Sequence, residues 1–261
     1  MSRCWAWLLV FLLLPLPGAS EPDALERQLE RALRKRAALD TLRRYTLTLE
    51  SPGSSLTRRV SILTKEFGER IYVLGAFVYP QDLRGTAFLA IDKPEGADRF
   101  VYFPAFRIVR RVGAHQKSDS WFGTDLSLED IEYRPARDFE ITGQGASEVR
   151  GDATLRIETR PRYGSAYERI HFHVVTPGDV IVRTEYFVAG RSTPSKRVEA
   201  EREGMRVSGD WAVPARVSCS NLDAGTRTLV SLDDVVFAPA YRREYFSTHT
   251  LEVWSKLKSL E

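Results

Sequence analysis

Hydrophobic and polar residues alternate with a period of two along most of the chain from Tyr45 to Leu232. This period is typical of β-strands, whose successive side chains point to opposite faces of a sheet. Short segments rich in proline, glycine and serine, such as Ser51–Ser55, separate the runs and predict turns. Strands are expected at residues 45–50, 56–64, 70–79, 86–91, 99–103, 106–112, 138–142, 153–159, 168–175, 180–188, 196–207, 211–218 and 226–232. The pattern therefore predicts an antiparallel sheet or barrel.

One segment has a helical period instead. Leu25, Leu29 and Leu33 recur at helical spacing between Glu21 and Leu42, with acidic residues early and basic residues late in the segment. We expect one amphipathic helix there. A narrow apolar stripe suits either a lid over a cavity or a helix that simply docks on the sheet.

The first twenty residues have the composition of a secretory signal peptide. Arg3 precedes an apolar run from Trp5 to Leu14, and helix-breaking and small residues follow up to Ser20. The apolar run is shorter than the roughly 20 residues that a membrane span needs, although an uncleaved anchor is the alternative. We expect a signal peptide at residues 1–20 and one domain at residues 21–261, because no repeat or low-complexity linker divides the rest.

Charge and cysteine content exclude several classes of protein. The formal net charge is +3, and Arg3 is the only charged residue of the first twenty, so the remainder is nearly balanced. Such a balance argues against nucleic-acid binding. Removal of Cys4 with the signal peptide leaves Cys219 without a partner for a disulfide, and we expect it to be a small buried side chain.

The sequence lacks the usual catalytic and nucleotide-binding motifs, so we predict no catalytic residues, no cofactor and no metal site. His171 and His173 share one face of a strand, which suits either two metal ligands or a structural or surface pair, and no further ligand is evident. Glu129 and Asp130 follow Ser127 as in a helix cap with an acidic first turn. The run of Arg107, Arg110 and Arg111 suits a phosphate or head-group contact, or a solvated face of the sheet.

The stretch Asp98–Ile131 contains the densest group of aromatic residues. A polar loop within it presents Trp121 and Phe122 beside Gly123. Large aromatic side chains gain most from leaving water, so a loop that carries two of them is expected to cover an apolar space. We interpret the stretch as the wall and edge of an apolar container.

Three motifs in a fixed order then resemble the LolA-like outer-membrane lipoprotein-sorting proteins. They are Phe77-Val-Tyr-Pro80 with Asp82-Leu-Arg-Gly-Thr86, Tyr102-Phe-Pro-Ala-Phe-Arg-Ile-Val-Arg-Arg111, and Lys117-Ser-Asp-Ser-Trp-Phe-Gly-Thr-Asp125 with Glu129-Asp130-Ile131. Weaker similarity extends the resemblance to about Tyr45–Leu251. Trp121-Phe122 stands where the family more often has Phe-Met, and Leu128 where it often has Tyr, so the residues that meet a ligand remain apolar.

The resemblance implies a strongly curved, incompletely closed antiparallel β-sheet, a half-barrel with an N-terminal helix across its mouth. It implies acyl chains of lipids or lipoproteins as ligands, a periplasmic location, an inner-membrane lipid exporter as a possible partner, and transient membrane contact. The predicted lipid-binding residues are large aromatic side chains of the three motifs: Phe77, Tyr79, Phe88, Tyr102, Phe103, Phe106, Trp121 and Phe122.

Three functions from different classes compete at this point. The leading hypothesis is a non-enzymatic carrier of lipids or lipoproteins toward the outer membrane. The second is a periplasmic interaction protein that docks on an exporter without cargo, which a cavity too narrow for an alkyl chain would favour. The third is a hydrolase, which requires titratable groups that converge in one pocket with perturbed pKa values.

Overall fold

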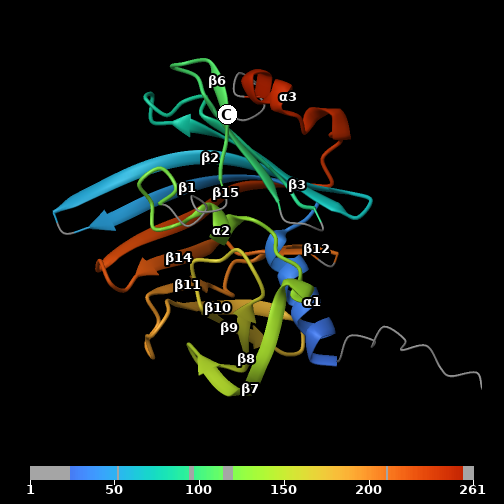
Figure 1. The fold of residues 1–261 in the computed structure, drawn as a ribbon, viewed down its shortest axis with the longest axis vertical. Coiled ribbons are helices and arrows are strands. Elements are labelled where there is room, and N and C mark those ends of the chain that lie inside the picture. Colours follow the sequence, from blue (N-terminus) through green and yellow to red (C-terminus); the bar gives the residue numbers. More distant parts are fainter. Residues whose placement is uncertain (1–23, 52, 94–96, 114–119, 210, 255–261) are drawn as a thin grey trace, which may run out of the picture.

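The computed structural model describes residues 24–51, 53–93, 97–113, 120–209 and 211–254. The predicted signal peptide lies outside these residues, as do the first residues of the predicted helix and of the Lys117–Asp125 motif. One antiparallel sheet of 13 strands forms about half of the described chain (Figure 1). Its strands are β1 (Thr41–Ser51), β2 (Ser54–Phe67), β3 (Arg70–Tyr79), β4 (Ala87–Ile91), β5 (Asp98–Phe103), β6 (Ile108–Arg111), β7 (Phe139–Val149), β8 (Asp152–Pro161), β9 (Arg169–Val175), β10 (Val180–Phe187), β11 (Lys196–Ala200), β14 (Arg216–Asn221) and β15 (Thr226–Phe237).

The remaining elements are short or lie against the sheet. They are the helices α1 (Ala24–Ala37), α2 (Leu128–Ile131) and α3 (Thr248–Trp254), the 3₁₀ turns η2 (Ala136–Asp138) and η3 (Arg243–Tyr245), and a two-stranded ribbon of β12 (Arg206–Ser208) and β13 (Trp211–Val213). Among the described residues, no helix has the length and apolar character needed to cross a membrane.

The strand order places the first and last strands of the chain side by side in the middle of the sheet. The order is β6-β5-β4-β3-β2-β1-β15-β14-β11-β10-β9-β8-β7. The pairing of β1 with β15 joins two meanders, and the outermost strands β6 and β7 do not meet. Figure 1 shows the curved sheet running from β6 to β7, with α1 and α2 in front of it. The predicted half-barrel with an N-terminal helix is confirmed.

The two faces of the sheet have different covers. We call the face that packs against α1 and residues 120–138 the inner face, and we call residues 120–138 the strap. The outer face packs against α3 through Phe246 and Leu251. Alternation is strict near β4, where Phe88 faces inward while Ala87 and Leu89 face outward.

The predicted helix ends earlier than the sequence pattern indicated. The structure has α1 at Ala24–Ala37, whereas the expected segment reached Leu42. Ala38 and Asp40 have left-handed backbone conformations (φ of 47° and 54°), which no helix continues through. Leu42 instead lies in β1 and is buried on the outer face, so tertiary packing overrides the helical spacing.

Two of the predicted strands are divided in the structure. The run 196–207 is divided into β11 and β12 around a turn with Gly204 at a φ of +73°. The run 211–218 is divided into β13 and β14, with Pro214 between them, where a missing N–H suits a break. β6 begins at Ile108, not at Phe106, because Arg107 takes a φ of 52°.

Candidate functional site

A partly enclosed cavity lies between α1, the strap and the inner face. Its volume is about 170 Å³. Its wall is mainly apolar and draws on α1, the strap and several strands, through Leu33, Tyr45, Leu47, Val60, Ile62, Trp121 and Val230 among others. A void beneath the N-terminal helix is the feature that a lid over a container requires.

The pairing of β1 with β15 builds the floor of this cavity. Leu47 of β1 lies opposite Val230 of β15, and Tyr45 faces the same side of the sheet. Val198 and Val217 come from the neighbouring strands β11 and β14. Small aliphatic side chains here leave space that larger ones would fill, so the cavity depends on residues far apart in sequence.

A second, smaller cavity of about 120 Å³ adjoins the first. Five residues line both spaces, and the boundary is formed by Arg36, Arg43, Tyr45, Val198 and Val217. The remaining wall of the smaller cavity comes from β10, the β12–β13 ribbon and the end of α1. The two cavities therefore form neighbouring parts of one hollow along the inner face.

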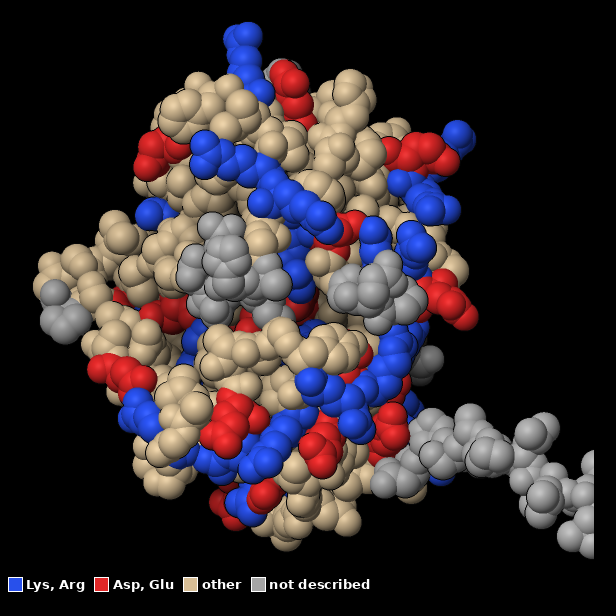
Figure 2. All heavy atoms as spheres, viewed as in Figure 1, with Lys and Arg blue, Asp and Glu red and all other residues tan. Residues whose placement is uncertain are grey.

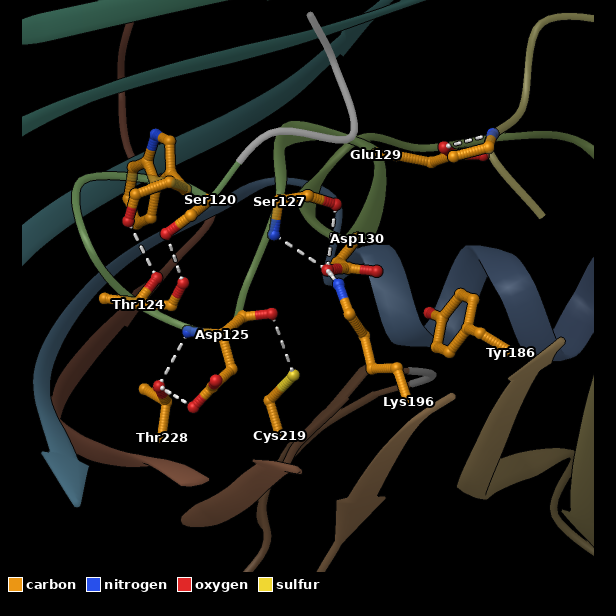
Figure 3. Close-up of polar contacts among 12 residues, drawn as sticks. Ser120, Thr124, Asp125, Ser127, Glu129, Asp130, Tyr186, Lys196, Cys219 and Thr228 are labelled. Atoms are coloured by element: carbon orange, nitrogen blue, oxygen red, sulfur yellow. Dashed lines mark hydrogen bonds and ion pairs between the residues drawn. The ribbon is translucent and has the colours of Figure 1, made fainter. Parts of the chain in front are cut away.

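The strap is tied to the C-terminal half of the sheet through Asp125 (Figure 3). Its backbone N–H donates to Thr228 Oγ1 at 2.9 Å, and its carboxylate accepts from the hydroxyls of Thr226 (2.5 Å) and Thr228 (2.8 Å). The thiol of Cys219 donates to the Asp125 carbonyl at 3.4 Å. A polar cavity of about 410 Å³ lies beside this attachment.

A buried ion pair holds the next turn of the strap. Asp130 Oδ2 accepts from Lys196 Nζ at 2.8 Å and from the N–H and hydroxyl of Ser127 at 2.7 and 2.9 Å (Figure 3). The side chain of Asp130 is only 2% exposed and that of Lys196 only 11%. Burial by itself lowers the pKa of Lys196, but the charge and hydrogen bond of Asp130, together with the nearby Tyr167 and Cys219, outweigh burial and raise that pKa above its usual value. The predicted cap at Ser127 is confirmed by α2, which begins at Leu128.

The buried thiol of Cys219 agrees with the prediction of a small core side chain. Cys219 is fully buried and free. Burial and the nearby Asp130 charge raise the pKa of its thiol well above the usual range. It is therefore an inert structural group.

Five of the eight predicted lipid-binding residues lie together on the inner face. Ring centroids of Phe77 and Phe88 lie 4.8 and 5.1 Å from that of Trp121, and Phe122 lies 4.8 Å from Phe77. Phe103 packs against the same cluster. Trp121 is the member of the five that lines the central cavity, and its buried Nε1 has no hydrogen-bond acceptor among the described residues.

The other three predicted residues lie elsewhere. Tyr102 is buried on the outer face, in the cluster that packs against α3. Tyr79 is 43% exposed and stacks against Arg59, while Phe106 is 72% exposed in the turn between β5 and β6. Ligand contact by these side chains remains a prediction.

Gly75 is a site residue that the sequence analysis missed. It lies opposite Phe88 in the β3–β4 pair, and a Cβ at this position would come within 2.3 Å of the Phe88 ring. Phe88 can lie flat over β3 and reach Trp121 only because the glycine leaves this space. A lone glycine inside a strand was the available signal.

His171 and His173 do project to one side of β9, on the outer face. His173 is buried, with Nδ1 3.0 Å from Ser147 Oγ and Nε2 3.3 Å from Glu185 Oε2. None of the three cavities described above is lined by these groups. Within the described part of the chain, no cluster of three or more histidine, cysteine or acidic side chains could hold a metal ion.

Surface charge is mixed on the face that Figure 2 shows, where acidic and basic side chains are interspersed. The run Arg107, Arg110 and Arg111 is exposed at the sheet edge, and Arg111 pairs with Asp98. These arginines thus face solvent, which both a head-group contact and a solvated face of the sheet require, so the choice between the two interpretations stays open.

The chain matches the model of one protein family. A model of a family of uncharacterized proteins matches residues 71–253, which is more than half of the chain. No curated protein matches the chain in sequence.

Three solved structures share the fold over most of their length. A DUF1329 family protein from Desulfovibrio piger has a TM-score of 0.78 at 22% identity, covering 88% of this chain and 100% of its own. An outer membrane lipoprotein-sorting protein domain from Vibrio parahaemolyticus has a TM-score of 0.77 at 21% identity, covering 87% and 99%. A LolA superfamily protein from Nitrosomonas europaea has a TM-score of 0.67 at 17% identity, covering 86% and 97%. The chain thus belongs to the family of uncharacterized proteins whose model it matches, and its fold is that of the LolA-like lipoprotein-sorting proteins.

Proposed function

We propose that the protein is a periplasmic carrier that binds acyl chains of lipids or lipoproteins and moves them toward the outer membrane. The observation that carries the proposal is the apolar cavity of about 170 Å³ beneath α1. The expected signal peptide supports the location, and the sorting function named for one structural neighbour supports the direction of transport. A membrane lipid exporter is the proposed donor of the cargo, and contact with each membrane is transient.

The size of the cavity suits reversible binding. An apolar protein cavity of about 150 Å³ is large enough to hold benzene, so this one can shelter a segment of about six carbons. Burial contributes about 0.8 kcal/mol per methylene, or about 5 kcal/mol for such a segment. This is enough to hold a chain in water and weak enough to let it leave for a membrane.

Among the predicted site residues, Trp121 is the proposed contact to the chain. Phe77, Phe88, Phe103 and Phe122 pack behind or beside it and fix its position. We propose no catalytic role for any side chain, and no cofactor.

The test is to fill the cavity. Val230→Trp places a large ring in the floor, whereas Val236→Trp on the same strand adds the same ring at a position 41% exposed. Uptake of a neutral fluorescent alkyl probe is expected to fall at least tenfold in Val230→Trp and to stay within twofold in the control. Equal uptake by the wild-type protein and a folded Val230→Trp variant would rule out this cavity as the binding site. Absence of uptake by the wild-type protein would favour an interaction protein without cargo.

A further inference from the structure

The charged side chains that line the smaller cavity are all basic, and the rest of its wall is mainly apolar. Lys35, Arg36, Arg43 and Arg183 line it, and no aspartate or glutamate of the described chain does. Arg183 is paired outside the cavity, with Glu199 at 2.6 Å. The other three basic groups therefore determine the electrostatic character of the space.

These three groups contact neutral partners. Lys35 Nζ donates to the Gly178 carbonyl at 2.5 Å, and Arg36 donates to Thr184 Oγ1 at 3.4 Å. Arg43 donates to Thr64 Oγ1 at 2.5 Å. Within the described residues, no carboxylate pairs with Arg36 or Arg43, although each is half-buried. Guanidinium groups in such surroundings are usually paired with an anion, because burial of an unpaired charge is costly.

Arg43 also carries an unused donor. Its Nε is buried and has no hydrogen-bond acceptor among the described groups of the protein. Buried N–H groups are nearly always satisfied, so an orphan in a cavity wall indicates a missing acceptor. A planar guanidinium matches a carboxylate or phosphate better than it matches a neutral oxygen.

The two arginines lie next to the larger cavity, which is the proposed site of the alkyl chain. Arg36 and Arg43 line both spaces and thus lie where the two meet. The larger cavity is also lined by Asp130 and Glu132, but each of these carboxylates is paired with a cation, Lys196 or Arg99. An anion held by the two arginines would therefore lie between two mainly apolar walls, which suits a molecule with a charged head and a hydrocarbon tail.

We propose that Arg36 and Arg43, with Lys35 beside them, form an anion site that holds the carboxylate or phosphate head group of an amphiphile. Its alkyl chain lies in the neighbouring apolar cavity. The inference rests on the proposed carrier function and extends it, because it names the class of cargo as anionic. A neutral alkyl chain would enter the same cavity with lower affinity.

The experiment compares four ligands in displacement of the neutral dye Nile red: dodecanoate, dodecyl phosphate, dodecanol and inorganic phosphate. The variant is Arg36→Gln/Arg43→Gln, and the matched control is Arg44→Gln, which removes one positive charge on the same strand at a residue paired with Asp234. In the wild-type protein, both anionic amphiphiles are expected to displace the dye at concentrations at least tenfold below that of dodecanol. The double variant is expected to lose this preference and to keep its dodecanol affinity within twofold, while Arg44→Gln keeps the preference.

Each contrary result has a distinct meaning. Equal displacement by dodecanol and the anions in wild type, or a preference retained by the double variant, overturns the anion site and leaves the carrier function standing. Displacement by inorganic phosphate alone shows a free-anion site and also overturns the amphiphile proposal. Failure of every alkyl ligand to bind overturns the carrier function, and the anion site as part of it.

A second measurement needs no variant. The attraction between an anionic head group and the basic side chains weakens as the Debye length falls from about 10 Å at 0.1 M salt to about 3 Å at 1 M. Half-buried charges are screened less than exposed ones, so the preference of the wild-type protein for dodecanoate over dodecanol should fall over this range, but by less than for exposed charges. A preference that grows with salt would refute an ionic origin, even if the double variant fails to fold.

Discussion

The ion pair between Asp130 and Lys196 offers the sharpest test of how the strap is held. Asp130→Asn keeps the shape of the side chain and removes its charge, which leaves the ammonium of Lys196 buried without a counter-charge. The side chains are 2% and 11% exposed and 2.8 Å apart, so solvent screens the pair little. Removal of one partner of such a buried pair costs about 3–5 kcal/mol of unfolding free energy.

A shift of this size is easily measured. For a chain of this length, about 1 kcal/mol corresponds to about 2–4 °C in Tm, so the variant should melt roughly 10 °C lower. Urea denaturation followed by far-UV circular dichroism gives the free energy directly. In a double-mutant cycle with Lys196→Met, the double variant should be less destabilised than the sum of the single variants, with a coupling of about 2 kcal/mol or more.

A matched control separates the effect of burial on stability from the effect of losing a charge. Asp223→Asn removes the same charge from a pair with Arg191 at 2.5 Å, in which both side chains are more than 40% exposed. Exposed pairs contribute about 0–1 kcal/mol, so this variant should stay close to the wild-type protein. If Asp130→Asn costs no more than Asp223→Asn, the strap is not held by a desolvated pair and the reasoning fails.

Two further changes test the packing and the electrostatics. Gly75→Ala should lower the free energy of unfolding by about 1–3 kcal/mol, because the added Cβ would overlap the Phe88 ring. Gly145→Ala is the control, because its Cβ meets no atom closer than 3.6 Å. Equal losses of stability in urea denaturation would contradict this account. The hydrogen bond from His173 lowers the pKa of Glu185 to about 2, so the ionised carboxylate stabilises the fold above pH 4.5 and this contribution is lost as pH falls toward 2. Glu185→Gln should therefore cost about 1 kcal/mol at pH 7 and progressively less below pH 4.5, and a difference from wild type that does not change with pH would refute the pairing.

The family motifs predict most of the strap from the sequence. Trp121 and Phe122 stood out because a polar loop gains nothing from two large aromatics unless they are covered, and Trp121 does line the cavity. Asp125 and Asp130 belong to the same motifs, yet their partners Thr228 and Lys196 are distant in sequence. The sequence therefore predicted the segment but not its attachment.

Alternation predicted strands without predicting which side of each is inner. Tyr102 and Phe103 are adjacent and must face opposite ways, but the period of two does not say which one faces the cavity. Packing against Phe246 and Leu251 decided it, and Tyr102 lies with them on the outer face. Likewise, the apolar character of Phe106 did not predict that its side chain is exposed in the turn between β5 and β6.

The order of hydrophobic and polar residues by itself determined the class of fold, because side chains of period two bury only one face and need an antiparallel partner. It could not determine the cavity, whose floor exists because β1 pairs with β15 and sets Leu47 beside Val230. That pairing joins residues more than 180 positions apart, and no local preference encodes it. Only the tertiary structure placed Arg36 and Arg43 beside the resulting hollow, where burial turns two ordinary surface charges into candidates for ligand binding.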